Sequence, residues 1–297
     1  MIVITGATGN TGRSAAEKLL EAGERVRAIG RNAEKLQALA HKGAEPLAGD
    51  VLDSGFLARA FSGADVAYLM IPPNMTSKDP RGEQERVTDS FAAAVKKSGI
   101  KRVVVLSSIG ADKSERTGPV VGLHNFEEKI KDIGGVNALF LRPTYFMENH
   151  LAQIPVIKAM GIMAGTIRAN LKMAQIATRD IAQATADALR ERDFEGHQTR
   201  ELLGPREITF EEAATIFGRT IGRPTLKYQQ VANSMAAMGM RQMGLSDEGV
   251  RLFLEMADAL NDRWMKPLET RSEVNTTPTT MEQFASDVFA PAYNRTA

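Results

Sequence analysis

The sequence predicts an α/β fold in which a doubly wound parallel sheet is followed by a smaller, mainly helical α/β domain. Two observations predict this class. Apolar runs of strand length alternate with amphipathic helical segments through the first half of the chain. Gly6, Gly9 and Gly12 follow the first apolar run and open the first helix. Strands separated by helices form parallel βαβ units covered on both faces, which is the Rossmann arrangement.

Each element of the first half is predicted from its own pattern. Strands are expected at residues 1–5, 25–29, 44–49, 66–71, 103–107 and 138–142. Helices are expected at residues 11–22, 33–41, 83–97 and 125–133, with a further helical face around Leu57, Ala60 and Phe61. The strand "VVVLS" is apolar almost throughout, which is typical of a sheet with both faces buried.

The pattern becomes less regular after about residue 150, where we expect a second domain. A strand and the turn at Gly204-Pro205 precede an amphipathic helix, and Thr209 with Glu212 predicts a capping box at its start. The first domain is assigned residues 1–150, with part of 171–195 packing back on it. The second, smaller domain is assigned residues 151–297.

The composition excludes several classes of function. There are 37 basic and 36 acidic residues without a basic block, so direct binding of nucleic acid is not expected. The chain has no cysteine, which excludes disulfides, thiol catalysis and cysteine-based metal centres, and no metal site is predicted. The first strand starts at residue 2 with no signal peptide before it, and no apolar run reaches membrane-spanning length. We expect a soluble, cytoplasmic protein without membrane contact.

The glycine-rich start predicts a dinucleotide site. Gly6 permits a sharp turn, Gly9 allows the backbone to approach a pyrophosphate, and Gly12 lets the helix pack closely on the strand. The helix then presents unpaired N–H groups and its positive end to the anion. Further donors from the same loop are Thr8, Asn10 and Thr11.

The end of the second predicted strand indicates which dinucleotide is bound. An NAD site carries an acidic residue there for the ribose 2′-OH, whereas this chain has Gly30-Arg31. The guanidinium of Arg31 suits a 2′-phosphate, so NADP(H) is predicted in preference to NAD(H). The alternative is that Arg31 is a solvated loop residue.

Two further segments are expected to line the cofactor at the carboxyl edge of the sheet. Asp50 and Val51 follow the third strand, where a carboxylate can meet the adenine amino group, although Asp50 could serve only the turn. Met70, Ile71 and Pro72 follow the fourth strand, at the edge where such sheets bind ligands.

The segments "GATGNTG", the arginine after the second strand, "VVLSSIGA" and "LRPTYFMEN" together resemble the NmrA-like group of atypical short-chain dehydrogenases. The resemblance spans most of the chain and is nearest to bacterial NAD(P)H:quinone oxidoreductase-like members. It implies an NADP-binding Rossmann domain, a small C-terminal domain for substrate or partner, and a cleft between them. Some members reduce quinones or other small electrophiles, and others sense the redox state of the cofactor and bind regulatory proteins.

The chain departs from the usual dehydrogenase pattern in its proton donor. The Tyr-x-x-x-Lys pair of that group is absent, because residues 110–135 contain no tyrosine. His124 stands near the place where the lysine of the group would project toward the nicotinamide. Lys129 lies five residues further on, which is off the same-face spacing of a helix.

The resemblance brings three candidate catalytic residues, Ser107, His124 and Tyr145. Ser107 ends the fifth strand, where dehydrogenases of this shape point toward substrate, although it could only cap the strand. His124 could bond the nicotinamide ribose or protonate a reduced quinone oxygen, or could be a surface or capping histidine. Pro143, Tyr145 and Phe146 are expected to wall the nicotinamide site, with interdomain packing as the alternative.

Two functions remain open on the sequence. The first is hydride transfer from NADPH to a small apolar electrophile, foremost a quinone, which accepts hydride so readily that a weak acid or water suffices. The second is a redox-sensing protein that closes on NADP(H) and presents a surface to a regulatory partner. Met235, Met238, Met240 and Met243 could form a lid over an apolar substrate or could only pack their helix.

Overall fold

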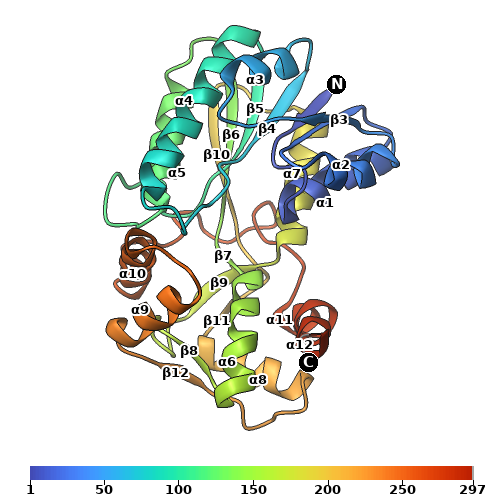
Figure 1. Cartoon of the computed structure of the whole chain (residues 1–297). Helices are drawn as coiled ribbons and strands as arrows, with labels where there is room; N and C mark the ends of the chain where they lie inside the picture. The colour runs from blue at the N-terminus through green and yellow to red at the C-terminus, as the bar shows by residue number, and fades with distance from the viewer. Residues whose placement is uncertain (296–297) are drawn as a thin grey trace.

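A seven-stranded parallel sheet forms the centre of the N-terminal part of the computed structural model, which describes residues 1–295 (Figure 1). The strand order is β10-β6-β5-β4-β1-β2-β3. The strands are β1 Ile2–Ile4, β2 Val26–Gly30, β3 Glu45–Ala48, β4 Val66–Leu69, β5 Arg102–Leu106, β6 Asn137–Pro143 and β10 His197–Leu202. The order changes direction between β1 and β4, and such a switch point opens a crevice at the carboxyl ends of the strands. The predicted Rossmann fold is therefore confirmed.

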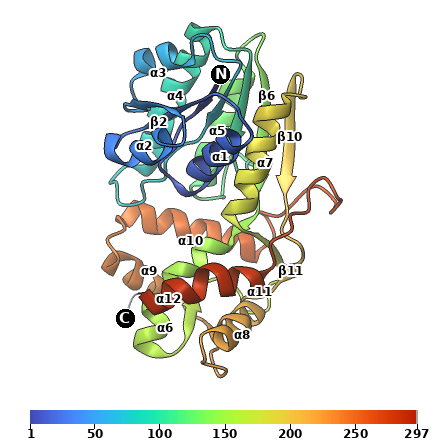
Figure 2. The ribbon, with the colours of Figure 1, turned by 90° about the vertical axis from the view of Figure 1, so that its right-hand side faces the viewer.

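Helices cover both faces of this sheet, as the alternation of its side chains requires (Figure 2). Ile2 and Ile4 of β1 point into the core beneath α1, α2 and α7, whereas Val3 points to the core beneath α3, α4 and α5. The helices are α1 Asn10–Glu21, α2 Ala33–Ala40, α3 Ser54–Phe61, α4 Pro80–Ser98, α5 Val120–Lys131 and α7 Thr178–Glu191. Helix α7 packs beside α1 although it follows residue 150.

The structure differs from the sequence predictions at the start of α5 and in the place of β10. Helix α5 begins at Val120 rather than at residue 125, because Gly118 and Pro119 end the preceding turn and Val120 and Val121 are already buried. Strand β10 falls within residues 151–297, which were assigned to the second domain, yet it pairs with β6 of the large sheet along its whole length.

A smaller part of the chain carries short sheets and the remaining helices. Strands β7 Tyr145–Phe146, β9 Met173–Ile176 and β11 Glu207–Ile208 form one sheet, and β8 Met163–Gly165 pairs with β12 Tyr228–Gln230. The helical segments are a 3₁₀ helix at Met147–Gln153, α6 Ile154–Met160, α8 Phe210–Thr220, α9 Asn233–Gln242, α10 Asp247–Asn261, α11 Met281–Phe284, a π-helical turn at Ala285–Phe289, and α12 Ala290–Arg295. Thr209 and Glu212 form the predicted capping box of α8.

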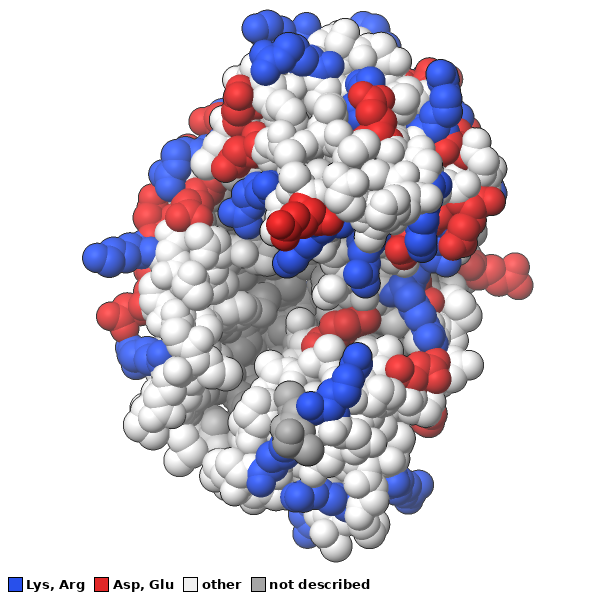
Figure 3. Space-filling model, turned by 45° about the vertical axis from the view of Figure 1, so that its right-hand side comes forward, with Lys and Arg blue, Asp and Glu red and all other residues white. Residues whose placement is uncertain are grey.

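The two parts meet along the carboxyl edge of the large sheet. Trp264, after α10, donates its indole N–H to the carbonyl of Glu115 at 3.2 Å, and Lys113 and Arg116 lie over its ring. The space-filling view shows a deep hollow between the upper and lower parts, with walls that carry few charged groups (Figure 3). Within residues 1–295, no helix has the length and apolar character needed to cross a bilayer.

Candidate cofactor and acceptor site

Two glycines of the loop leave no room for a side chain. Gly6 has a φ of +63°, and a Cβ on it would lie 2.6 Å from the sulfur of Met70. A Cβ on Gly12 would lie 2.4 Å from the carbonyl oxygen of Gly6. The backbone at Gly6 and Gly12 is therefore packed closely at the switch point between β1 and β4, which is the arrangement that lets the loop turn tightly beneath a pyrophosphate.

Two buried hydroxyl groups attach the glycine loop to β4. The Thr5 hydroxyl donates to the carbonyl of Tyr68 at 2.9 Å and accepts the N–H of Met70 at 3.2 Å. The Tyr68 phenol lies 3.3 Å from the Thr11 hydroxyl, and burial raises the pKa of this phenol above its usual value. Tyr68 is thus a neutral structural contact between β4 and the loop.

The start of α1 lacks the negative charge that a helix N-terminus favours. Its N-cap, Gly9, has no side chain to accept the free N–H groups, and the first turn contains no acidic residue. The first charged residue of the helix is the exposed Arg13, a cation at the positive end of the helix dipole. Such an arrangement suits an anionic ligand. Arg13 was not among the residues predicted from the sequence, although its place directly after Gly12 indicates a cation close to the bound anion.

Arg31 lies at the end of β2, directly beside the glycine loop. A Cβ on Gly30 would be 3.0 Å from the Thr8 methyl group, so the two segments touch. Asn32 uses its side chain to accept the N–H of Lys35 as the cap of α2, whereas Arg31 is exposed. The guanidinium is therefore accessible to an anion bound over the loop.

The residues expected near the cofactor after β3 and β4 differ in how far their side chains are buried. The Asp50 carboxylate accepts the N–H of Leu52 at 3.0 Å, which closes the turn after β3, and Val51 is half-buried next to it. Met70 covers Gly6, and Pro72 is half-buried. The side chain of Ile71 is buried in the core beneath α3 and α4, so this residue offers the site only its backbone.

His124 lies on α5 with one ring nitrogen already engaged. Its Nδ1 is 2.9 Å from the carbonyl oxygen of Ala111, in the loop after β5. A carbonyl only accepts, so Nδ1 carries a proton in this contact and Nε2 remains for another partner. The ring is partly buried.

Ser107 has a protein partner rather than an open face. Its side chain is buried, and its hydroxyl donates to Oε1 of Glu127 at 2.5 Å. Glu127 in turn pairs with Arg142. This geometry does not support the expected direct role of Ser107 toward substrate, and the buried Glu127–Arg142 pair was not foreseen.

Pro143, Tyr145 and Phe146 continue from the carboxyl end of β6 into the junction of the two parts. Pro143 is buried, and Tyr145 and Phe146 are half-buried. The Tyr145 ring lies 5.4 Å from the ring of Phe210. Burial raises the pKa of the Tyr145 phenol above its usual value, so the phenol stays protonated and is a weak acid.

His150 is a buried histidine inside the aromatic core of the smaller part. It is 1% exposed, its Nε2 lies 2.7 Å from the Gln175 side-chain oxygen, and the rings of Tyr145, Phe210 and Phe217 surround it. Burial lowers its pKa to about 4 from an ordinary value of 6.5. The folded protein therefore holds this ring neutral at pH values where the unfolded chain protonates it.

We expect acid to destabilise the fold through His150. The unfolded chain binds a proton near pH 6.5 and the folded chain only near pH 4, so stability is complete above pH 6.5 and decreases as the pH falls between these values. The total loss is about 3 kcal/mol. Urea unfolding from pH 7.5 to 4.5 measures it, and His150→Gln should flatten this part of the curve. The exposed His197→Gln is the control, and an equal flattening by it would contradict the assignment.

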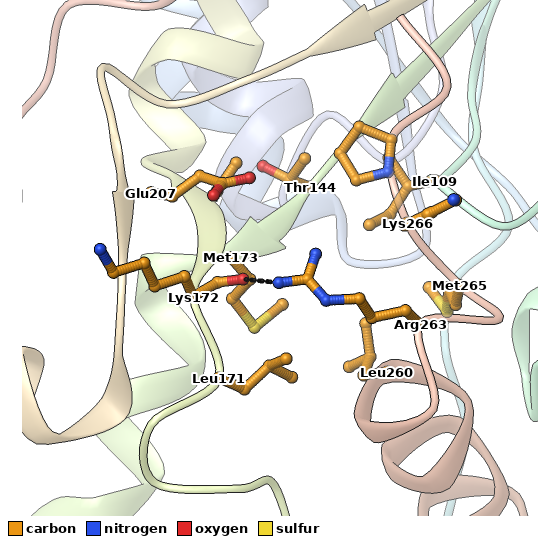
Figure 4. A pocket seen from close by; sticks show the side chains of 12 residues that line it. Ile109, Thr144, Leu171, Lys172, Met173, Glu207, Leu260, Arg263, Met265 and Lys266 are labelled. Carbon is orange, nitrogen blue, oxygen red and sulfur yellow. Dashed lines mark hydrogen bonds between the residues drawn. The ribbon is translucent and has the colours of Figure 1, made fainter.

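A small, partly open cavity lies at the junction, between the loops after β5 and β6 and the end of α10 (Figure 4). Its volume is about 30 Å³, which leaves room for water but not for a nicotinamide ring. Arg263 donates to the carbonyl of Lys172 at 3.5 Å, and Figure 4 shows the ammonium groups of Lys172 and Lys266 pointing away from the centre.

Comparison with known proteins decides the family. The model of the NmrA-like family matches residues 1–285, which is nearly the whole chain. The chain belongs to the NmrA-like family. The resemblance predicted from "GATGNTG" and "LRPTYFMEN" is thereby confirmed.

Curated relatives of this NmrA-like chain include reductases. It is 30% identical over 231 residues to the (4-alkanoyl-5-oxo-2,5-dihydrofuran-3-yl)methyl phosphate reductase of Streptomyces griseus, which covers 78% of this chain and 77% of the relative. It is 29% identical over 252 residues to quinone oxidoreductase 2 of Escherichia coli, with 83% of each chain covered. A crystal structure of the NADPH-dependent quinone oxidoreductase of E. coli with NADPH superposes with a TM-score of 0.80 at 25% identity, over 97% of this chain and 100% of that one.

The NmrA-like fold brings some of the predicted residues together and separates others. The glycine loop, Met70 and the end of β2 with Arg31 form one continuous surface at the switch point. His124 lies further along the carboxyl edge, in contact with the loop after β5. Ser107 turns into the protein toward Glu127. Within the described residues, no cluster of three or more side chains suited to a metal ion is present.

Proposed function

We propose that this protein is an NADP(H)-dependent oxidoreductase that transfers hydride to a small apolar acceptor, foremost a quinone. The observation that carries the proposal is the bare glycine loop at the switch point, where Gly6 and Gly12 exclude any side chain and exposed Arg31 lies alongside. The reductases among the relatives support the class of reaction, and the quinone oxidoreductase of E. coli supports the class of acceptor.

The residues of the loop fit an NADP(H) molecule. The backbone from Gly6 to Gly12 would hold the pyrophosphate at the N-terminus of α1. Arg31 and Arg13 would hold the 2′-phosphate and the neighbouring negative charge, and the turn at Asp50 would lie near the adenine. These contacts favour NADP(H) over NAD(H), because a carboxylate for the 2′-OH is missing at the end of β2.

The acceptor would occupy the hollow below the carboxyl edge of the sheet. The walls of this hollow carry few charges (Figure 3), which suits an apolar ring. Met235 and Met238 on α9 and Met243, directly after it, are 57%, 58% and 59% exposed, so packing within the protein does not account for them. Flexible thioether side chains suit flat apolar ligands of varied shape, and we propose that they close over the acceptor.

His124 would supply the proton that a reduced quinone needs. The bound cofactor would supply a hydride, which consists of two electrons and one proton. One further proton completes the hydroquinone. With Nδ1 held by the carbonyl of Ala111, a protonated ring would donate from Nε2 to the acceptor oxygen and return to neutral. The Tyr145 phenol, with its raised pKa, is the weaker candidate for this step.

Turnover of NADPH with a panel of benzoquinones and naphthoquinones tests the proposal. We expect loss of the nicotinamide absorbance with at least one acceptor, and a decrease of kcat by at least about tenfold in His124→Ala. The exposed His41→Ala is the matched control and should leave kcat unchanged. Tight NADPH binding without turnover on any acceptor would contradict the enzyme and favour the redox-sensing alternative.

A further inference from the structure

Helix α5 is joined to the sheet by an ion pair that is shielded from solvent. The Glu127 side chain is 0% exposed and that of Arg142 is 9% exposed. Arg142, at the end of β6, donates from Nε and Nη2 to the two oxygens of Glu127 at 2.8 and 2.6 Å. Ser107, which follows β5, donates to the same carboxylate at 2.5 Å. Three hydrogen bonds thus connect one helix to the carboxyl ends of two strands.

The pair contributes orientation more than stability. Removing two charges from water offsets most of their attraction, so a buried ion pair often stabilises a fold no better than apolar residues of equal size. A planar guanidinium that meets both oxygens of a carboxylate does fix the relative direction of the two groups. Glu127 and Arg142 therefore define how α5 is rotated and how far it lies along the sheet.

The rotation of α5 determines where the His124 ring lies. His124 precedes Glu127 by three residues, so the two side chains project from neighbouring positions on one face of the helix. The other side of the ring is held by the carbonyl of Ala111. The loop that contains Ala111 is itself held by the Trp264 indole, which donates to the carbonyl of Glu115. The imidazole is thus located by one anchor on its helix and one on its loop.

The same arginine faces a second buried carboxylate. Glu201 on β10 is the register partner of Arg142, and its side chain is also buried. It accepts the N–H groups of Leu268 and Glu269 at distances between 2.8 and 3.0 Å. Arg142 therefore lies between the helix that carries His124 and the strand whose Glu201 binds the segment after α10.

We propose that Glu127 and Arg142, with Ser107, are positioning residues that fix the His124 imidazole with Nδ1 toward the protein and Nε2 toward the acceptor. The role of His124 as proton donor rests on the function proposed above. The fixed position and tautomer of the ring do not depend on turnover, so they can be measured separately.

Nitrogen-15 NMR of the four histidines measures the position of this ring directly. In the NADPH-saturated protein we expect His124 to show a single tautomer protonated at Nδ1, identified by the signal lost in His124→Ala. In Glu127→Gln the ring should average between tautomers, because its helix loses the charged anchor. Asp89→Asn is the matched control, since it breaks the exposed ion pair between Asp89 and Lys129, and Lys129 lies on α5 like Glu127. The side chains of Lys129 and Asp89 are 50% and 53% exposed. This control should retain the single tautomer.

Two further variants separate positioning from folding. Ser107→Ala removes one hydrogen bond and retains the ion pair, so it should fold and show a partial loss of tautomer order. Glu127→Leu/Arg142→Met replaces the pair by apolar groups and should keep the wild-type unfolding midpoint within a few degrees. It should nevertheless decrease kcat with a quinone about tenfold, with an unchanged KM for NADPH.

The outcomes distinguish this proposal from the proposed function. A folded Glu127→Gln or Glu127→Leu/Arg142→Met protein that keeps the wild-type tautomer would overturn the positioning role, whatever the activity. A wild-type protein with the fixed tautomer but no turnover would support the positioning role and contradict the quinone reductase.

Discussion

Arg31→Glu is expected to weaken NADPH binding by about a hundredfold, or about 2.7 kcal/mol, and to leave NADH binding unchanged or tighter. The exposed guanidinium beside the glycine loop would lose its contacts to the 2′-phosphate, and a carboxylate in its place would repel that phosphate. A carboxylate at the end of β2 also accepts the 2′-OH of NAD(H). Titration of protein fluorescence with each nucleotide measures both affinities.

Lys35→Glu provides the matched control for this reversal of charge. Lys35 is an exposed cation four residues further along, on α2. The Lys35→Glu variant should reduce NADPH affinity far less than Arg31→Glu does, because long-range attraction between charges is screened at physiological salt. Unchanged NADPH affinity in Arg31→Glu, with NADH still bound weakly, would show that Arg31 does not select the cofactor.

Gly12→Ala is expected to decrease the affinity for both nucleotides by about a hundredfold or more. The added Cβ would lie 2.4 Å from the carbonyl oxygen of Gly6, so the loop must move away from the pyrophosphate position. Gly9→Ala should distort the loop less, because its Cβ would lie 3.3 Å from the same oxygen, so any loss of affinity there reports the contact with the pyrophosphate itself. Calorimetric titration with NADPH and NADH ranks the two variants.

Gly239→Ala serves as the control for adding a methyl group to a glycine. Gly239 lies on α9, and a Cβ there meets no atom within 4 Å. This variant should bind NADPH normally and gain up to about 1 kcal/mol of stability from helix propensity. If Gly12→Ala remains folded by circular dichroism and binds NADPH as wild type does, the loop is not the pyrophosphate site.

The sheet could be predicted from sequence because its signals are local. Short apolar runs such as "VVVLS" alternate with amphipathic helical segments, and the glycine spacing marks the first βα turn. The capping box at Thr209 is likewise a pattern within four residues. These features need no knowledge of which distant segments meet.

Other features depend on contacts across the chain. In the sequence, Glu127 resembles an ordinary helical surface residue between Phe126 and Glu128. Its charge can be buried because Arg142 pairs with both carboxylate oxygens and Lys131 lies 3.5 Å from one of them. The inward turn of Ser107 follows from the same contact. Strand β10 could not be assigned to the large sheet because its partner β6 is about 60 residues earlier in the chain, and several elements of the smaller part lie between them in the sequence.

A single-turnover experiment tests the central claim most directly. Protein saturated with NADPH deuterated at either of the two C4 positions is mixed with a naphthoquinone, and the nicotinamide absorbance is followed. We predict that the absorbance decays with every sample and that deuterium at only one of the two positions slows the decay, as direct transfer from one face of a fixed ring requires. Stoichiometric binding of NADPH with no decay for any quinone, or a decay that neither label slows, would contradict the account.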